Sequence, residues 1–510
     1  MKQKKMNKRI VIAGPGAGKT YDMVEEVLKA CQNISFNRYC AVITYTNSAT
    51  DEIRRRLQQK IFIPSNLFIG TIHSFLNKFF VLPFSSPLLD IAQDKVFLQT
   101  NNDSFGNRGT SVVDRAIKKK RAIEKLNKDG KITYDETINL AEKIIALKQP
   151  KVADVISNRI EYLFIDEFQD ICNKQIKIFG EILKTSRTHC YIVGDPEQYI
   201  SWWSSNRISS FLNIPFFKFM KNTKVVPKIN HVNRRSSKEI VEFLNNFSNR
   251  EYHPSGKFHQ NSTDDKPLGI PVSFLSITNP EDILEEFLAC VERYSLTDKK
   301  KMVLAKHKDI AKQFSQLDVW ESKDKTNTSL YVLWERIITT AFQKKVSEIL
   351  FEKNINKIQF RKLVMQVAAC YSETKNMQEI LEKVFEIKPT IKIGKKELKK
   401  IGVNIERDER RCRISHVHSF KGLEAESILM VAKTCEELNL WLETDQKKRD
   451  IKQKNELDMV RVGYVGFSRA RKFLCITCLE NIDQDVKTKL ESFKINIVEK
   501  DKMSLNSKDK

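Results

Sequence analysis

The stretch GPGAGKT, residues 14–20, stands between a run typical of a β-strand, residues 9–13, and a run typical of a helix, residues 21–31. Its glycines allow successive backbone N–H groups to curl around an anion at a helix N-terminus, where the helix dipole favours negative charge. In that arrangement Lys19 reaches the β- and γ-phosphates of a nucleotide and Thr20 ligates Mg²⁺. A glycine-rich turn without a ligand is the alternative, but the flanking strand and helix favour a phosphate-binding loop.

Outward from this loop, strand-like and helix-like runs alternate with short connections as far as residue 72. Such alternation predicts an α/β fold with a doubly wound parallel sheet. Ligands of such sheets bind at the carboxyl ends of the strands, so ITYTNSAT (residues 43–50) and GTIHSF (residues 70–75) should lie beside the loop. Tyr45, Asn47 and His73 suit contacts to a base and to phosphates, although a helix cap explains the polar residues after Tyr45 equally well.

Two further strand-like runs end in polar side chains. EYLFIDEFQD, residues 161–170, delivers the adjacent carboxylates Asp166 and Glu167, whose burial is costly unless a cation or hydrogen-bond network uses them. Asp166 can hold Mg²⁺ and Glu167 can orient and deprotonate the attacking water, while capping of the next helix is the alternative. HCYIVGDPEQYISWW, residues 189–203, brings Gln198 toward the γ-phosphate and ends in two tryptophans, one of which is a candidate stacking platform for a base.

The composition indicates a polyanionic partner. The 510-residue chain has 88 Lys and Arg against 64 Asp and Glu, a formal net charge of +24. Nucleic acid is favoured over a membrane because no basic amphipathic helix accompanies a hydrophobic anchor, with a lysine-rich solvated surface as the alternative. We expect no signal peptide and no membrane span, and ten scattered cysteines indicate reduced thiols in the cytoplasm. Cys475 and Cys478 lie in a run that we interpret as a buried strand rather than a metal site.

A chain of this length exceeds one hydrophobic core and predicts several domains. We expect a first domain at residues 1–80 and 132–215, with a helical insertion at residues 81–131. We expect a second domain at residues 216–317 and 403–490, with a helical insertion at residues 318–402. A basic tail follows at residues 491–510. The run KKKR in the first insertion is either a groove for a nucleic-acid backbone or an exposed helix face. LETDQKKRDIKQK, residues 442–454, reads as a solvated linker, and the end of the chain as disordered.

Eight motifs between residues 9 and 480 occur in the order of one known family: GPGAGKT, ITYTNSAT, GTIHSF, FIDEFQD, VGDPEQ, VNRRSS, HSFKGLE and YVGFSRAR. With them the chain resembles superfamily 1 helicases of the UvrD/Rep type. The resemblance implies two RecA-like doubly wound domains with ATP and Mg²⁺ in the cleft between them. It also implies single-stranded DNA across the top and stepping along DNA in the 3′ to 5′ direction.

The resemblance implies roles for residues at matching positions. The implied catalytic residues are Glu167, Asp166, Gln198, Arg235 and Arg469. The implied nucleotide-binding residues are Gly14, Gly16, Ala17, Gly18, Lys19, Thr20, Glu424 and Arg234, and Thr20 and Asp166 are the implied metal ligands. The candidate DNA-binding residues are Tyr45, Asn47, His73, Trp202, Trp203 and His418. A guanidinium supplied across a cleft neutralises transition-state charge only when the cleft closes, which would link hydrolysis to movement.

Three positions depart from the family pattern. The family has a glutamine-containing adenine motif before the phosphate loop, and Gln3 fits its spacing poorly. Arg234 stands where the family has an aromatic residue that stacks on adenine, although a guanidinium can also stack on a base. Ser204 stands where the family has an arginine. Adenine selectivity and the coupling between DNA and nucleotide are therefore in doubt.

In its size, in stretches such as NLFIGT and FIDEFQD and in its compact insertions, the chain most resembles the helicase-like subunit of the Gabija anti-phage defence system. That resemblance implies a partner, an ATPase-nuclease of the overcoming-lysogenisation-defect (OLD) type. Two alternatives are a stand-alone repair or plasmid-replication helicase and a non-catalytic module gated by nucleotide. The presence of Lys19, Asp166, Glu167 and Arg469 together argues against the non-catalytic module, because a protein freed from hydrolysis needs no such set.

Overall fold

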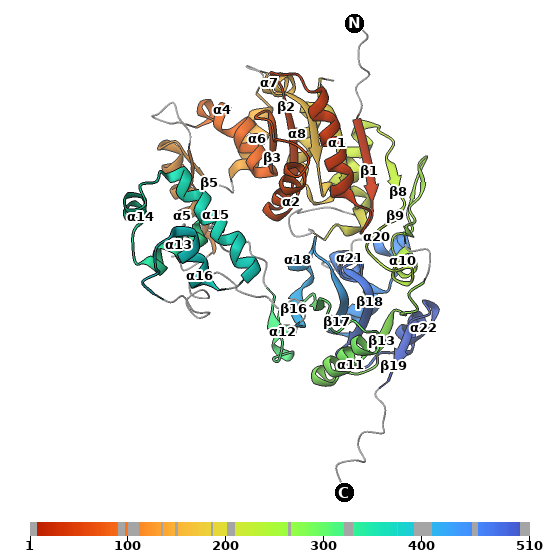
Figure 1. The fold of residues 1–510 in the computed structure, drawn as a ribbon. Helices are drawn as coiled ribbons and strands as arrows, with labels where there is room; N and C mark the ends of the chain where they lie inside the picture. Colours follow the sequence, from red (N-terminus) through yellow and green to blue (C-terminus); the bar gives the residue numbers. More distant parts are fainter. Residues whose placement is uncertain are drawn as a thin grey trace. The chain divides into compact units, whose positions relative to one another are not determined.

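The computed structural model describes residues 8–89, 97–99, 112–133, 136–147, 151–184, 187–200, 210–263, 267–320, 330–374, 376–391, 411–450 and 457–499. The chain divides into two compact units. The larger unit comprises Met1–Trp320 with Cys412–Lys510, and the smaller unit comprises Glu321–Arg411. Figure 1 labels their helices and strands along the chain.

The first sheet of the larger unit is parallel throughout and has the strand order β3-β2-β6-β7-β1-β8. Its strands are β1 (Lys8–Ala13), β2 (Tyr39–Thr44), β3 (Leu67–Thr71), β6 (Ile160–Ile165), β7 (His189–Gly194) and β8 (Lys228–Asn230). Ile12 pairs with Gly194, and Ile43 pairs with Ile165, so the carboxyl ends of β1, β7, β2 and β6 meet at one edge. This edge is where the sequence places the candidate site.

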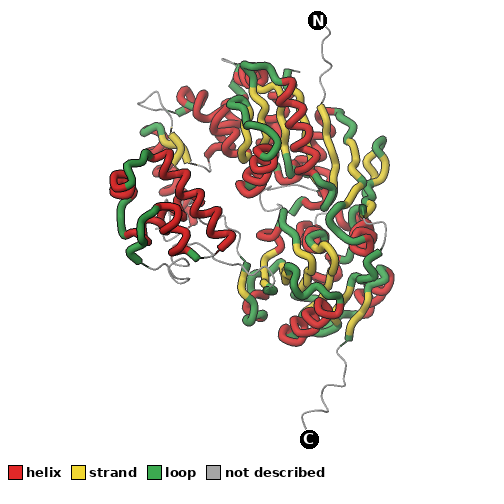
Figure 2. The backbone as a smooth tube through the Cα atoms, in the orientation of Figure 1, coloured by secondary structure: helices red, strands yellow, loops and turns green. Residues whose placement is uncertain are grey.

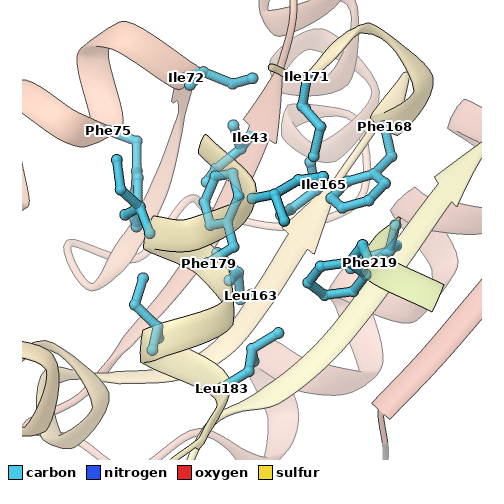
Figure 3. Close-up of a cluster of buried hydrophobic side chains, with 14 of the residues drawn as sticks. Ile43, Ile72, Phe75, Leu163, Ile165, Phe168, Ile171, Phe179, Leu183 and Phe219 are labelled. Atoms are coloured by element: carbon cyan, nitrogen blue, oxygen red, sulfur yellow. The ribbon is translucent and has the colours of Figure 1, made fainter. Parts of the chain in front are cut away.

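Both faces of this sheet are apolar because parallel sheets are covered by helices on both sides. Along β1, Ile10 and Ile12 join one core while Val11 joins another, as the two-residue repeat of a strand requires. One face packs against α1 (Lys19–Asn33) and α2 (Asn47–Gln58). The other packs against α3 (Ile72–Leu76), α6 (Thr137–Ile145), α7 (Val152–Arg159), α8 (Asn173–Lys184) and α9 (Pro215–Thr223). Figure 3 shows the second core, in which Phe75, Phe179 and Phe219 surround the β6 residues Leu163 and Ile165.

The second sheet is also parallel and has the strand order β15-β16-β14-β17-β18-β13-β19. Its strands are β13 (Ser273–Leu275), β14 (Lys301–Ala305), β15 (Asp318–Val319), β16 (Arg413–His416), β17 (Ala425–Ala432), β18 (Ala470–Cys478) and β19 (Asn496–Val498). The two parallel sheets confirm the predicted α/β class with two RecA-like domains. Figure 2 shows the strands of both sheets, in yellow, with red helices around them.

Helices cover both faces of the second sheet as well. One face packs against α11 (Pro280–Arg293) and α12 (Ile310–Gln313), and the other against α10 (Lys238–Asn245), α18 (Val417–Phe420), α19 (Cys435–Trp441), α21 (Leu457–Phe467) and α22 (Gln484–Ser492). Helix α11 illustrates the local code. Asn279 caps it by accepting hydrogen bonds from the backbone N–H groups of Glu281 and Asp282, and Pro280 occupies its first turn. Its buried residues then recur at helical spacing: Ile283, Leu284, Phe287, Cys290 and Val291.

The larger unit contains further short elements. They are α4 (Leu82–Phe84), α5 (Val112–Lys128), α20 (Gln446–Asp450), the ladder of β4 (Phe97–Gln99) with β5 (Lys131–Thr133), the ladder of β9 (Val232–Asn233) with β12 (Asn261–Ser262), and the ladder of β10 (Glu251–Tyr252) with β11 (Gly256–Lys257). Helix α5 carries the basic run, in which Lys118, Lys120 and Arg121 are exposed. Their exposure fits the solvated-face interpretation and leaves the nucleic-acid groove open.

The smaller unit is a helical bundle with its own core. Its described helices are α13 (Leu330–Phe342), α14 (Val346–Glu352), α15 (Lys357–Thr374) and α16 (Met377–Phe385). Trp334, Phe360 and Phe385 are among the buried residues of its core. The expected insertion at 318–402 overlaps this unit, although β15 at the start of that range belongs to the second sheet.

Three details differ from the ranges and segments expected from the sequence. Strand β8 lies beyond residue 216 but pairs with β1 in the first sheet. Strand β19 lies inside the expected tail but pairs with β13, because Ile497 packs on a core of the second sheet. The solvated-linker interpretation of residues 442–454 is wrong for Leu442 and Arg449, which are buried. Cys475 and Cys478 lie on β18 and are buried free thiols, as expected.

Among the described helices, none combines the length and the apolar character that a membrane span would need.

Candidate nucleotide-binding site

The phosphate-loop candidate runs directly from β1 into α1. Gly16 has φ of 68° and Gly18, the N-cap of α1, has φ of 79°, conformations that favour glycine. A Cβ on Gly16 would lie 2.2 Å from Asn233 Oδ1, so space also excludes a side chain there. Lys19 Nζ donates hydrogen bonds to the carbonyls of Ala13 (3.4 Å) and Gly14 (3.3 Å). The loop therefore has the conformation and the lysine that a phosphate cradle requires.

Asp166 and Glu167 follow the carboxyl end of β6. Asp166 Oδ1 accepts the backbone N–H of Glu167 at 2.9 Å, and the Thr20 side chain is close enough to favour the charged form of Asp166. Burial and the charge of Glu167 raise the pKa of Asp166 to about 7, against the lowering effect of Lys19. Burial acts in the same direction on Glu167, but Lys19 and Lys421 lower the pKa of Glu167 to about 2. The two neighbouring acids thus differ in protonation, with Glu167 held as the charged acceptor.

Gln169 fixes the orientation of Glu167. Its Nε2 donates to Glu167 Oε2 at 2.6 Å, and its Oε1 accepts the backbone N–H of Asp195 at 3.0 Å. A Cβ on Gly194 would lie 2.6 Å from Gln169 Oε1, so the glycine makes room for this amide. Glu167 itself has φ of 48°, a left-handed conformation that is unusual outside glycine and is often found at functional sites. Sequence reasoning missed Gln169, because only its contacts mark it.

Gln198 joins the two sheets. Its Nε2 donates to Asp195 Oδ2 at 2.7 Å, and its Oε1 accepts a hydrogen bond from Arg469 Nη2 at 2.7 Å. Arg469 is tied to the end of α21 by the bond from its Nε to the Val465 carbonyl at 2.9 Å. Gln198 and Arg469 are both buried. The arginine predicted to come from the second domain therefore meets the residue predicted to sense the γ-phosphate.

Arg235 and Glu424 form an ion pair. Arg235 Nε lies 2.5 Å from Glu424 Oε2, and Arg235 Nη1 donates to the Ser468 carbonyl at 3.1 Å. Arg471 Nη1 approaches the other carboxylate oxygen at 3.4 Å. Burial raises the pKa of Glu424, but Arg235 and Arg471 bring the net shift below its ordinary value. Glu424, an implied nucleotide-binding residue, is therefore ionised and lies beside Arg235, an implied catalytic residue.

Arg234 and Gln260 lie against the loop on its other side. Arg234 donates from its backbone N to the Gly16 carbonyl and from Nη1 to the Ala17 carbonyl, each at 2.8 Å. Gln260 Nε2 donates to the Pro15 carbonyl at 3.1 Å. Sequence reasoning missed Gln260, which lies about 240 residues beyond the loop in a stretch without a motif. Gln3 lies outside the described residues.

Lys421 provides a second link between the two sheets, and the sequence did not single it out. Its Nζ contacts both carboxylate oxygens of Asp170, at 2.7 and 2.8 Å, and the Gln198 carbonyl at 3.0 Å. Asp170 is nearly inaccessible to solvent. The position of Lys421 in HSFKGLE was the available signal, but the motif alone does not identify Asp170 as its partner.

The candidate DNA residues lie at strand ends. Tyr45 is exposed and Asn47 begins α2, both after β2; His73 lies in α3 after β3, and Thr44 pairs with Thr71. These two loops are therefore neighbours. His418 lies in α18 after β16, with its ring stacked on His416 at 4.9 Å between centroids. Burial and His416 lower the pKa of His418 to about 4, so His418 is neutral near pH 7. Trp202, Trp203 and Ser204 lie outside the described residues.

The donor set fits Mg²⁺ bound together with phosphates. Magnesium is held in such sites by one or two oxygen ligands of the protein, by water and by the substrate phosphates. Thr20 and Asp166 lie close together and supply those oxygens. Among the described residues no group of three or more His, Cys, Asp or Glu side chains could hold a metal by itself. The site is therefore suited to a metal that arrives with its nucleotide.

A family model described as an AAA domain matches residues 2–204. The chain is 25% identical to DNA helicase II of Haemophilus influenzae over 54% of this chain and 43% of that protein. It is 26% identical to a probable DNA helicase II homolog of Mycoplasma capricolum, over 46% of this chain and 38% of that protein. It is 22% identical to the ATP-dependent DNA helicase PcrA of Staphylococcus aureus, over 50% of this chain and 40% of that protein. The chain thus spans about two fifths of the length of these relatives, and the matches support the resemblance to UvrD-type helicases.

Proposed function

We propose that this chain is an ATP-dependent DNA helicase or translocase of the UvrD/Rep type. The observation that carries the proposal is the hydrogen bond from Arg469 to Gln198. Gln198 follows a strand of the first sheet, whose carboxyl edge also carries Lys19 and Glu167. A nucleotide at the loop would bring its γ-phosphate to a place served by both sheets. The relatives named as DNA helicases and the net charge of +24 support DNA as the partner.

The proposed reaction is attack of water on the γ-phosphorus of ATP. Glu167 orients the water and accepts its proton as the new O–P bond forms and the bond between the γ-phosphorus and the bridging oxygen breaks. Lys19 and the loop N–H groups hold the phosphates, and Arg469 and Arg235 neutralise charge that develops on the leaving group and γ-oxygens. Mg²⁺, held by Thr20 and Asp166, would neutralise phosphate charge. The γ-phosphate would also raise the pKa of Glu167 from about 2, which favours proton transfer.

We propose that single-stranded DNA runs over the strand ends that carry Tyr45, Asn47, His73 and His418, with Trp202 and Trp203 as further contacts. An aromatic ring such as Tyr45 can stack on any base, and its exposure leaves it available. Stepping in the 3′ to 5′ direction follows from the family resemblance.

The test is ATP hydrolysis by the full chain with and without single-stranded DNA. We expect DNA to raise the rate several-fold and Lys19→Ala to abolish it, while Lys29→Ala, an exposed lysine on the same helix, leaves it unchanged. DNA affinity should fall by orders of magnitude between about 50 and 200 mM salt if phosphate contacts dominate. A rate that DNA does not change would contradict the proposal.

We also propose that the chain acts in an anti-phage defence complex with an OLD-type ATPase-nuclease. The support is the finer sequence resemblance to the Gabija subunit and the compact helical unit of residues 321–411. Purification from the native host discriminates this role from that of a stand-alone repair helicase. A nuclease recovered at equal stoichiometry, encoded by a neighbouring gene, is expected; a chain that purifies without one and complements a repair defect would contradict the defence role.

A further inference from the structure

Two consecutive residues of one turn contact arginines of the α21 region, one within the helix and one just beyond its end. The turn is the 3₁₀ segment Pro196–Gln198 that follows β7. Glu197 Oε2 lies 3.3 Å from Arg461 Nη2 in the first half of α21, and Gln198 Oε1 accepts from Arg469, just beyond its end. Arg461 and Arg469 are eight residues apart, about 12 Å along a helix. The turn therefore lies along the helix that delivers the candidate γ-phosphate arginine.

Glu197 is the shared acceptor of three arginines. Besides Arg461, its carboxylate contacts Arg250 Nε at 3.1 Å and Arg449 Nη2 at 3.4 Å. Asp450 is the second acid of the cluster, 2.6 Å from Arg250 and 3.1 Å from Arg461. We call these five residues the Glu197 cluster. Three guanidinium groups and two carboxylates leave it with a net charge of one positive, and the side chain of Glu197 is 1% exposed.

The cluster has few acceptors to spare. The Nε atoms of Arg449 and Arg461 are buried without a hydrogen-bond partner in the described part of the chain. The guanidinium of Arg461 lies 3.3 Å from the centroid of the Phe211 ring, which offers only a weaker cation–π contact. Without the Glu197 carboxylate, Arg449 would retain the Glu443 carbonyl, at 2.9 Å from its Nη1, as its only other hydrogen-bond acceptor among the described residues. Loss of this one acid would therefore leave buried positive charge uncompensated.

Separation of the turn from α21 would also leave the buried arginines of the Glu197 cluster without their carboxylate. Buried charges must stay paired, and removal of one partner from such a pair is strongly destabilising. The turn and α21 are therefore expected to move as one body whenever the two sheets shift relative to each other. In contrast, Gln198 and Arg469 are joined by one hydrogen bond in which Gln198 is uncharged, so this contact is the easier one to remodel around a nucleotide.

We propose that Glu197 is a positioning residue that, through Arg461 and the other arginines of the Glu197 cluster, sets the register of Gln198 against Arg469. This role rests on the proposed function, because it concerns where Gln198 and Arg469 meet the γ-phosphate. Glu197 itself does not touch the nucleotide in this arrangement. Its carboxylate fixes the turn on α21, and the adjacent amide is thereby held opposite the arginine.

The test compares Glu197→Gln with Glu437→Gln in the full chain. Glu437 is the matched control, a buried acid of the second sheet region that accepts the backbone N–H of Lys433 and lies apart from the Gln198 contacts. For each variant we would measure thermal unfolding, the Kd for ATP with Mg²⁺, and kcat at saturating single-stranded oligothymidylate. We expect Glu197→Gln to lower kcat at least tenfold while the Kd for ATP stays within about threefold, because the loop that binds phosphate is untouched. Glu437→Gln should keep kcat within twofold.

A second variant keeps the proposal testable if Glu197→Gln does not fold. Arg461→Lys keeps the charge but loses the fork, in which Nη2 contacts both acids of the Glu197 cluster while Nη1 donates to the Arg449 carbonyl at 2.9 Å. It should therefore also lower kcat with little change in ATP affinity. An active wild type beside a Glu197→Gln or Arg461→Lys variant with unchanged kcat would overturn the positioning role alone. A wild type without DNA-stimulated hydrolysis would overturn the proposed function, and the positioning role with it.

Discussion

The larger unit buries two groups of charges that differ in how completely the protein compensates them. Asp166 and Glu167 are adjacent acids, and burial with the like charge raises the pKa of Asp166 to about 7. Glu197 is buried as deeply, but Arg461, Arg250 and Arg449 overcome the effect of burial and lower its pKa to about 2. The first group is suited to a ligand that brings its own cation. In the second group the protein's own arginines compensate the Glu197 carboxylate, which suits this group to position other residues.

This difference predicts opposite effects when the carboxylates are neutralised. Glu167→Gln should lower kcat about 10² to 10⁴-fold, because it removes the acceptor for the proton of the attacking water. Asp166→Asn, in contrast, should not lower the thermal unfolding midpoint, since it removes the burial cost and the repulsion that raise the pKa of Asp166. Hydrolysis assays and thermal unfolding measure the two effects.

Glu161→Gln is the matched control for this prediction, because Glu161 lies at the other end of β6 and accepts the backbone N–H of Ser35. It should leave kcat unchanged. If Glu167→Gln retained more than a tenth of the wild-type kcat, the assignment of Glu167 as the base would be wrong.

The ion pair of Lys421 with Asp170, which links the two sheets, tests whether a buried acid depends on its paired cation. Lys421→Met leaves the Asp170 carboxylate buried without its cation, which should cost about 3 kcal/mol of unfolding free energy. It should also lower kcat, because Lys421 holds the Gln198 carbonyl. Urea unfolding and hydrolysis assays report the two losses.

The double variant Lys421→Met with Asp170→Asn should recover most of that stability, since no unpaired charge remains. The surface variant Lys433→Met serves as the control for loss of a lysine. Equal destabilisation of the single and the double variant would show that the pair itself is not the cause.

The sequence predicted the first group of charges and missed the second for a physical reason. Strand ends, glycines in a loop and adjacent acids are local signals, so Gly16, Lys19, Asp166 and Glu167 could be identified within short windows. The two parallel sheets followed from the same alternation of runs, because burial on both faces makes such strands continuously apolar.

The Glu197 cluster carries no such signal. Arg250 and Arg461 are 53 and 264 residues from Glu197 along the chain, and each arginine by itself is typical of solvated surface. Arg449 was placed in a solvated linker for that reason, although it is fully buried. Long-range pairing of charges is specified only by the assembled fold.

The stability that Glu197 contributes should depend on pH. Its pKa is lower in the folded chain than the ordinary value of 4.5, so the contribution is complete above about pH 5 and is lost as pH falls toward 2. The charged and titratable groups around it include Arg250, Arg449, Arg461, Asp450, Asp195, Tyr252 and Tyr464. Between pH 7 and pH 4 the wild type should lose about 1 kcal/mol more unfolding free energy than Glu197→Gln. Urea unfolding at both pH values measures the difference in unfolding free energy between the wild type and Glu197→Gln. A difference that stays the same at pH 7 and pH 4 would contradict the low pKa of Glu197.

An ion pair that is not buried should contribute almost nothing to stability or activity. The exposed pair of Lys433 with Asp309 tests this case. Their side chains are 44% and 51% exposed, and Lys433 Nζ lies 2.7 Å from Asp309 Oδ2, as close as Lys421 lies to Asp170. Solvent screens an exposed pair, and both side chains lose conformational freedom when they form it. Asp309→Asn should therefore leave the urea midpoint and kcat unchanged. A loss comparable to that of Lys421→Met would show that short charge contacts, and not their burial, determine which ion pairs hold this protein together.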